Sequence, residues 1–130
     1  MRAYHEDHHG HSVIVECGPA TGTLTDARRT YAFKGGYCER QPQNNFQVFI
    51  GDVSTARGND GQPYFFLTAD TRTHRGSIGV SFGGKVIVPA STVDLTGSLL
   101  HGAFAGKNAN TGAAFSGSWN CHGVMYVGPN

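Results

Sequence analysis

The segment from residue 101 to residue 121, HGAFAGKNANTGAAFSGSWNC, contains the pattern that decides the fold. Its second half alternates strictly between two faces. One face carries Ala113, Phe115, Gly117, Trp119 and Cys121, and the other carries Ala114, Ser116, Ser118 and Asn120. This period of two predicts a half-buried β-strand that ends in a cysteine, with the only tryptophan of the chain on its core face.

The residues just upstream predict a partner for this strand. Leu100, Gly102 and Phe104 alternate in the same way, and the polar stretch Lys107–Gly112 between the two strands contains the glycine and asparagines that suit a hairpin loop. We therefore expect two antiparallel strands.

Length and composition extend this prediction to the whole chain. The chain has 130 residues, which favours one domain, and its 19 glycines with only 15% charged residues favour short strands and tight turns over helices. The formal net charge of +1 gives no reason to expect nucleic acid as a partner. The class predicted is all-β, an antiparallel β-sandwich or flattened barrel of about eight to ten strands.

Further short strands follow from apolar runs between turn signals. They are expected at Val13–Val15, Thr21–Thr25, Thr30–Lys34, Phe46–Ile50, Tyr64–Thr68, Ile78–Phe82, Lys85–Val88, Val93–Thr96 and Val124–Val127.

Several boundaries and environments are also expected. Gly35-Gly36 should break or bulge one strand, and Pro89–Ser91 should end another. Tyr64–Thr68 is almost wholly apolar and should be covered on both faces. Residues 1–12 are polar and rich in histidine and are expected to be a disordered tail, so that residues 13–130 form the single domain.

The three cysteines, Cys17, Cys38 and Cys121, have no zinc-binding spacing. The favoured interpretation is a disulfide between Cys38 and Cys121, which would tie an early strand to the last long one and leave Cys17 as the odd thiol. In the chain-entropy model a loop of that length stabilises by about 4–5 kcal/mol. The alternative is three reduced cysteines in the core. A disulfide favours an extracytoplasmic protein, secreted or on the cell surface, whose targeting segment is absent from this chain; the alternative is a protein that stays inside the cell.

Four segments resemble a known family. These are Thr30–Phe33 followed by Cys38, then Phe46–Gly51, then Gly102–Phe104, then Phe115–Cys121. In this order they resemble the secreted actinobacterial lipoprotein antigens of the mycobacterial nineteen-kilodalton type, over about residues 23–121. The resemblance implies a small β-rich, surface-exposed antigen or adhesin with no catalytic motif. Cys17 has no counterpart in that pattern, and no N-terminal cysteine is present for acylation.

The densest cluster of ligand-type side chains lies outside that resemblance. Residues 5–11 contain His5, His8, His9 and His11 together with two carboxylates, a combination that Zn²⁺, Cu²⁺ or Ni²⁺ favours. The alternative is an unstructured tail with incidental metal affinity. No other cofactor is implied.

Two weaker binding features remain. Arg72, His74 and Arg75 form a cationic turn that would suit a carboxylate, phosphate or sulfate. Aromatic residues on the less committed strand faces would suit stacking on a sugar; they are Tyr4, Tyr37, Phe49, Tyr64 and Tyr126.

No catalytic motif and no apolar stretch of membrane-spanning length is present in the sequence. The leading hypothesis is therefore a non-enzymatic, exported protein that binds an unidentified protein or glycan through a sheet face or loops. The alternatives are an extracytoplasmic metal-binding protein and an enzyme whose site is assembled from distant loops. Nothing in the sequence specifies an oligomeric state.

Overall fold

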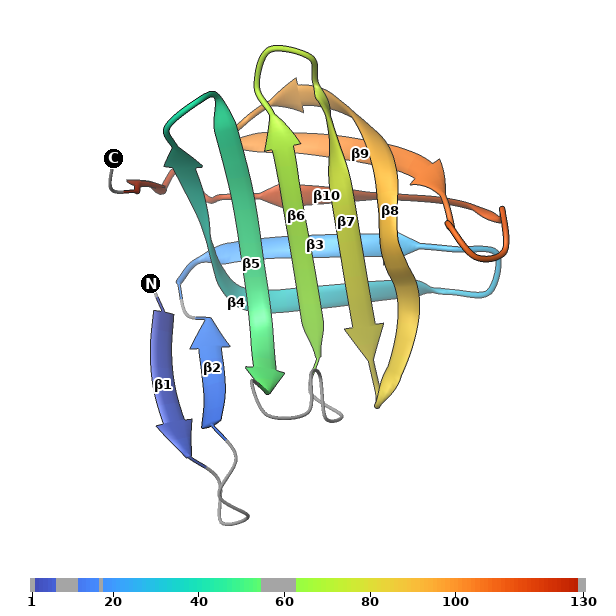
Figure 1. The fold of residues 1–130 in the computed structure, drawn as a ribbon, viewed down its shortest axis with the longest axis horizontal. Helices are drawn as coiled ribbons and strands as arrows, with labels where there is room; N and C mark the ends of the chain where they lie inside the picture. The colour runs from blue at the N-terminus through green and yellow to red at the C-terminus, as the bar shows by residue number, and fades with distance from the viewer. Residues whose placement is uncertain (1, 7–11, 17, 55–62, 129–130) are drawn as a thin grey trace.

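The computed structural model describes residues 2–6, 12–16, 18–54 and 63–128 (Figure 1). Among these residues the secondary structure consists of strands and contains no helix, which confirms the all-β prediction. The strands are β1 (Arg2–Glu6), β2 (Ser12–Glu16), β3 (Ala20–Thr25), β4 (Thr30–Gln41), β5 (Asn45–Ser54), β6 (Tyr64–Asp70), β7 (Arg75–Phe82), β8 (Lys85–Ser98), β9 (His101–Lys107), β10 (Ala114–Asn120) and β11 (Met125–Val127).

Strands β3 to β10 form a closed antiparallel barrel in which each strand pairs with its neighbours in the chain. The barrel closes where β10 pairs with β3, and in that register Ser116 lies opposite Thr25 and Asn120 opposite Thr21. Eight strands give an interior just wide enough to be filled by side chains. The fold is thus a flattened barrel, one of the two architectures that the sequence predicted.

The barrel is flattened into two layers whose strands cross. In Figure 1, β5, β6 and β7 run up and down in front, whereas β3, β4, β9 and β10 run across behind them. Strands β4 and β8 belong to both layers, because β4 pairs with β3 and with β5, and β8 pairs with β7 and with β9. Long strands that change layer in this way are typical of orthogonal sheet packing.

Glycine lets β4 change layer. Gly35 has a φ of 85°, and a Cβ on Gly36 would lie 2.0 Å from the carbonyl oxygen of Phe49. The strand therefore bends here without ending. Glycine at position 35 adopts a positive φ without strain, and glycine at position 36 leaves room for the neighbouring carbonyl oxygen. Of the two outcomes expected for Gly35-Gly36, the strand bulges and does not break.

In β8, the expected end at Pro89–Ser91 was wrong. The strand continues through Pro89 because the register with β7 shifts here: Ile78 lies opposite Ser91, whereas Val80 lies opposite Val88. Pro89 thus lies at a bulge, where its missing N–H costs no ladder hydrogen bond.

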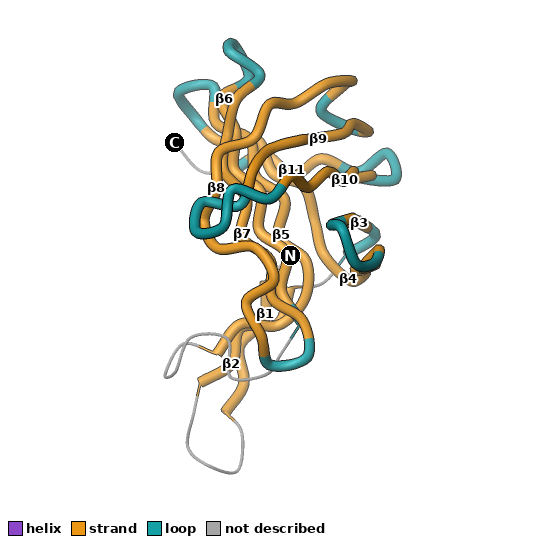
Figure 2. Tube along the Cα trace, turned by 90° about the vertical axis from the view of Figure 1, so that its right-hand side faces the viewer, coloured by secondary structure: helices purple, strands orange, loops and turns teal. Residues whose placement is uncertain are grey.

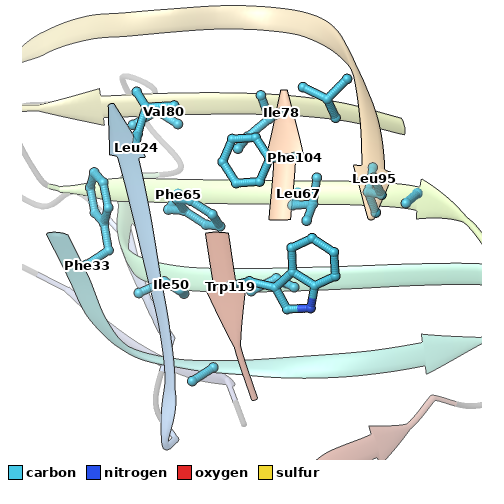
Figure 3. Close-up of a cluster of buried hydrophobic side chains, with 14 of the residues drawn as sticks. Leu24, Phe33, Ile50, Phe65, Leu67, Ile78, Val80, Leu95, Phe104 and Trp119 are labelled. Carbon is cyan, nitrogen blue, oxygen red and sulfur yellow. The ribbon is translucent and has the colours of Figure 1, made fainter. Parts of the chain in front are cut away.

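The core lies between the two layers (Figure 3). Side chains from both layers point toward one another there, and the largest that are fully buried are Trp119, Phe46, Phe65, Leu24, Ile50, Leu67 and Ile78. Phe115, Trp119 and Cys121 are buried, as the alternation of their strand predicted. The indole N–H of Trp119 donates to the carbonyl oxygen of Leu99 at 2.7 Å, so the one polar atom of this ring is satisfied.

The N-terminal region differs from the expected tail. Strands β1 and β2 pair with each other, and β2 pairs with the last residues of β5, so that they form a hairpin beyond the barrel (Figure 2). The polypeptide thus enters regular structure at Arg2, before Val13. Within the described residues no helix is long and apolar enough to cross a membrane.

Candidate functional site

On the outer face of β4 to β7, residues that lie opposite one another in neighbouring strands form three rows across the sheet. The residues that alternate with them along each strand, such as Val48 and Leu67, point to the other face and are buried in the core. The rows are Tyr37, Phe49, Phe66 and Gly79; Glu39, Gln47, Thr68 and Ser77; and Gln41, Asn45, Asp70 and Arg75. The first row is apolar and the other two are polar.

The apolar row is a chain of aromatic rings in contact. Ring centroids lie 5.3 Å apart for Tyr37 and Phe49 and 4.6 Å apart for Phe49 and Phe66. Tyr64 stacks on Phe66 at 6.3 Å, and Tyr126 of β11 packs edge-on against Tyr37 at 5.8 Å. Tyr37, at the β4 end of the row, is only 4% exposed, whereas Tyr126 is exposed.

Of the aromatic residues expected on free faces, the structure thus brings together Tyr37, Phe49, Tyr64 and Tyr126. The side chain of Tyr4 lies outside the described part of the chain.

The polar rows contain a hydrogen-bond chain that runs in one direction. The hydroxyl of Thr68 donates to Asn45 Oδ1 at 3.1 Å, and Asn45 Nδ2 donates to Gln41 Oε1 at 3.1 Å. Gln41 Nε2 in turn donates to Glu39 Oε1. Each amide is fixed in orientation by its two partners, and the carboxylate at the end of the chain polarises all the links.

A shallow groove of about 280 Å³ lies at the start of this chain. We call it the outer-face groove; its lining residues are Gln43, Asn44, Asn45, Thr68, Ala69, Asp70, Gly76 and Ser77. Thr68 and Ser77 face each other across β6 and β7 on its floor. Amide, hydroxyl and carboxylate groups therefore line a surface with no cation among its described residues.

Asp70, at the edge of the groove, is held by the turn that follows β6. Its Oδ1 accepts hydrogen bonds from the backbone N–H of Arg72 at 2.7 Å and of Thr73 at 3.3 Å. The backbone N–H of Arg72 is the main reason why the pKa of Asp70 is lowered from 3.8, with a further contribution from the Arg72 guanidinium. The carboxylate is ionised at neutral pH and accepts hydrogen bonds only.

The cationic turn proposed from the sequence is already neutralised in part. Arg72 lies 3.4 Å from Asp70, and Arg75 lies 3.2 Å from Asp94 on β8. His74 has a φ of 58° at the end of the turn, and its carbonyl oxygen accepts the backbone N–H of Leu95. Both arginines thus have carboxylate partners, which lowers the attraction of this turn for an anion.

Cys38 and Cys121 form a disulfide, with Cα atoms 5.7 Å apart, as the sequence predicted. Cys38 lies on β4, and Cys121 directly follows β10. Cys17 lies outside the described residues.

The histidine cluster is described only at one position. His5 lies in β1, whereas His8, His9 and His11 fall outside the described residues, so a Zn²⁺, Cu²⁺ or Ni²⁺ site there stays a prediction. Among the described residues, no group of three or more histidines, cysteines or carboxylates is placed to hold a metal ion.

Sequence reasoning missed the polar rows, although their signal is present. In Asn45-Phe46-Gln47-Val48 and in Leu67-Thr68-Ala69-Asp70, polar residues alternate with core residues. The alternation identified the inward set, but only the register shows that the outward residues of different strands meet.

Comparison of the chain with protein-family models, with curated proteins and with solved structures finds no match in any of the three.

Proposed function

We propose that the protein is a non-enzymatic, exported binding protein that holds a neutral glycan on the outer face of β4 to β7. The observation that carries the proposal is the directional hydrogen-bond chain from Thr68 to Glu39 beside the aromatic row. Its amides are fixed before any ligand arrives, so little conformational entropy is lost on binding.

The chemistry of a sugar matches both halves of this face. Sugar hydroxyls both donate and accept, and Asn45, Thr68 and Asp70 offer acceptors and donors at half-buried positions. The C–H faces of a sugar ring pack on aromatic rings. Phe66 lies on the same face of β6 as Thr68, two residues before it. A neutral sugar has no negative charge that a lysine or arginine would have to bind, and the described residues of the groove include no such cation.

Export is supported by the disulfide between Cys38 and Cys121, because disulfides persist in oxidising compartments. A surface location would also agree with the resemblance to secreted lipoprotein antigens. A catalytic role finds no support among the described residues of the groove, where Asp70 is the one carboxylate and is already held by its own turn.

The test is a glycan microarray with neutral and acidic oligosaccharides, followed by calorimetric titration with the tightest-binding neutral one. We expect saturable binding that weakens about tenfold or more in the double variant Asn45→Leu, Thr68→Val, because each lost hydrogen bond is worth about 0.5–1.5 kcal/mol. The oligosaccharide should be recovered with unchanged mass.

The matched control is Thr96→Val, an exposed threonine of β8 outside the groove. It should bind like the wild type. Absence of oligosaccharide binding by the wild type, equal weakening by Thr96→Val, or cleavage of the oligosaccharide would each overturn the proposal.

A further inference from the structure

A second groove lies at one end of the barrel, away from the outer-face groove. Three hairpin turns form it: β3 to β4, β7 to β8, and β9 to β10, on the right and lower right in Figure 1. We call it the end groove; its volume is about 430 Å³, within the range of small-molecule sites. Its lining residues include Asp26, Arg28, Tyr31, Lys85, Val86 and Phe115.

Tyr31 lines this groove, and its hydroxyl has no hydrogen-bond partner in the described part of the chain. The residue is only 7% exposed, and its ring packs edge-on against Phe82 at 5.4 Å. Its hydroxyl makes no hydrogen bond with any described residue, although buried tyrosine hydroxyls normally have a partner. A hydroxyl donor in this position is available to an acceptor atom of a bound molecule.

The charge of the end groove is positive. Arg28 and Lys85 line it, and the guanidinium of Arg29 lies beside it, 4.5 Å above the Tyr31 ring. Asp26 is the one carboxylate among the described lining residues, and its Oδ1 already accepts the backbone N–H groups of Arg28 at 2.8 Å and Arg29 at 3.0 Å. Neither Arg28 nor Lys85 has a carboxylate within ion-pair distance in the described part of the chain.

The rest of the groove wall is apolar. Val86, which lies opposite Ser81 near the turn of the β7–β8 hairpin, is 66% exposed and lines the groove. Ile87, Val88 and Phe115 continue this apolar surface toward the barrel interior. Cations and a tyrosine hydroxyl thus adjoin a hydrocarbon wall.

From this combination we infer that the end groove binds a small amphiphilic carboxylate, with its carboxylate at Arg28, Lys85 and the Tyr31 hydroxyl and its hydrocarbon body along Val86 and Phe115. Charge-assisted hydrogen bonds to the carboxylate would fix its orientation. Burial of the hydrocarbon body would supply the hydrophobic part of the affinity. The site is separate from the outer-face groove and does not depend on the glycan proposal.

The experiment is an amide NMR titration of the full chain with decanoate below its micelle concentration, and with decanol as the uncharged analogue of the same length. We expect saturable shifts that centre on the β3–β4 and β7–β8 turns, and tighter binding of decanoate than of decanol. In the double variant Arg28→Gln, Lys85→Gln, the affinity for decanoate should fall about tenfold or more and come close to the affinity for decanol. Tyr31→Phe removes only the hydroxyl, so it should lower the affinity for decanoate and leave the affinity for decanol unchanged.

The matched control is Arg72→Gln, which removes one positive charge from a turn outside the groove. It should leave the decanoate affinity unchanged. The inference is overturned if decanoate causes no saturable shifts, if the shifts centre on the outer-face groove, if decanol binds as tightly as decanoate, or if Arg72→Gln weakens decanoate as much as the double variant.

Discussion

At the scale of single residues, Gly102 shows how closely the barrel is packed around Trp119. A Cβ built on Gly102 would lie 2.4 Å from the Trp119 ring and 2.6 Å from the Thr96 carbonyl oxygen. Neither neighbour can move easily, since the indole is buried and hydrogen-bonded and the carbonyl belongs to a paired strand. Gly102 is therefore required by close packing and not by an unusual backbone conformation.

Gly102→Ala should lower the free energy of unfolding by about 1–3 kcal/mol, because overpacking displaces the Trp119 ring or separates β8 from β9. Gly79→Ala is the matched control, since its Cβ would meet its nearest neighbour, Tyr64, at 3.8 Å. That variant should unfold at the same urea concentration as the wild type or slightly higher. Urea titrations followed by far-ultraviolet circular dichroism measure both, and equal midpoints would contradict the packing argument.

At the scale of elements, the β7–β8 hairpin has a turn that matches its sequence. Gly83 and Gly84 have φ values of 62° and 79°, the positive pair that a two-residue type I′ turn requires. The glycine pair predicted this hairpin, because few other residues adopt both conformations. By contrast, the continuation of β8 through Pro89 could not be predicted, since a bulge depends on the register of the partner strand.

Gly83→Asn should leave the free energy of unfolding nearly unchanged, because Asn-Gly also favours this turn. Gly83→Val should lower it by about 1–2 kcal/mol, since a β-branched residue resists positive φ. Space is not a factor, because a Cβ at Gly83 has no neighbour within 4 Å. Chemical denaturation of the two variants under identical conditions separates these outcomes; equal stability would exclude a backbone origin.

At the scale of the whole molecule, the closed barrel joins parts of the chain that lie far apart. The pairing of β10 with β3 links residues near 118 to residues near 23. Cys38 and Cys121, 83 residues apart, reinforce the same side of the barrel. A disulfide over so long a loop restricts the unfolded chain strongly.

The double variant Cys38→Ala, Cys121→Ala should lower the free energy of unfolding by about 2–4 kcal/mol. Treatment of the wild type with a reductant should shift its urea midpoint in the same direction and by a similar amount. The intact mass after thiol alkylation without reduction gives the direct check: two alkylated thiols at Cys38 and Cys121 would contradict the structure.

The sequence predicted most strands because alternation of apolar and polar residues is a local signal. It predicted the disulfide because three cysteines allow only a few pairings. Phe115, Trp119 and Cys121 share the buried face because side chains in a strand alternate between its two faces. Closure of the barrel could not be predicted, because nothing in Thr21–Thr25 specifies β10 as its partner. Tyr64–Thr68 was expected to be covered on both faces, yet Phe66 is half-buried and belongs to the outer aromatic row.

The closing pair of strands has a consequence for how the chain matures. Strand β3 is made early, but β10, the strand that pairs with its second edge, is among the last to be made. During that interval the edge can pair with a neighbouring chain, a common route to aggregation. Cys121 follows directly after β10, so its disulfide with Cys38 forms only after β10 has been made. The bond holds the end of β10 close to β4, the other neighbour of β3, and so opposes separation of β3 from β10.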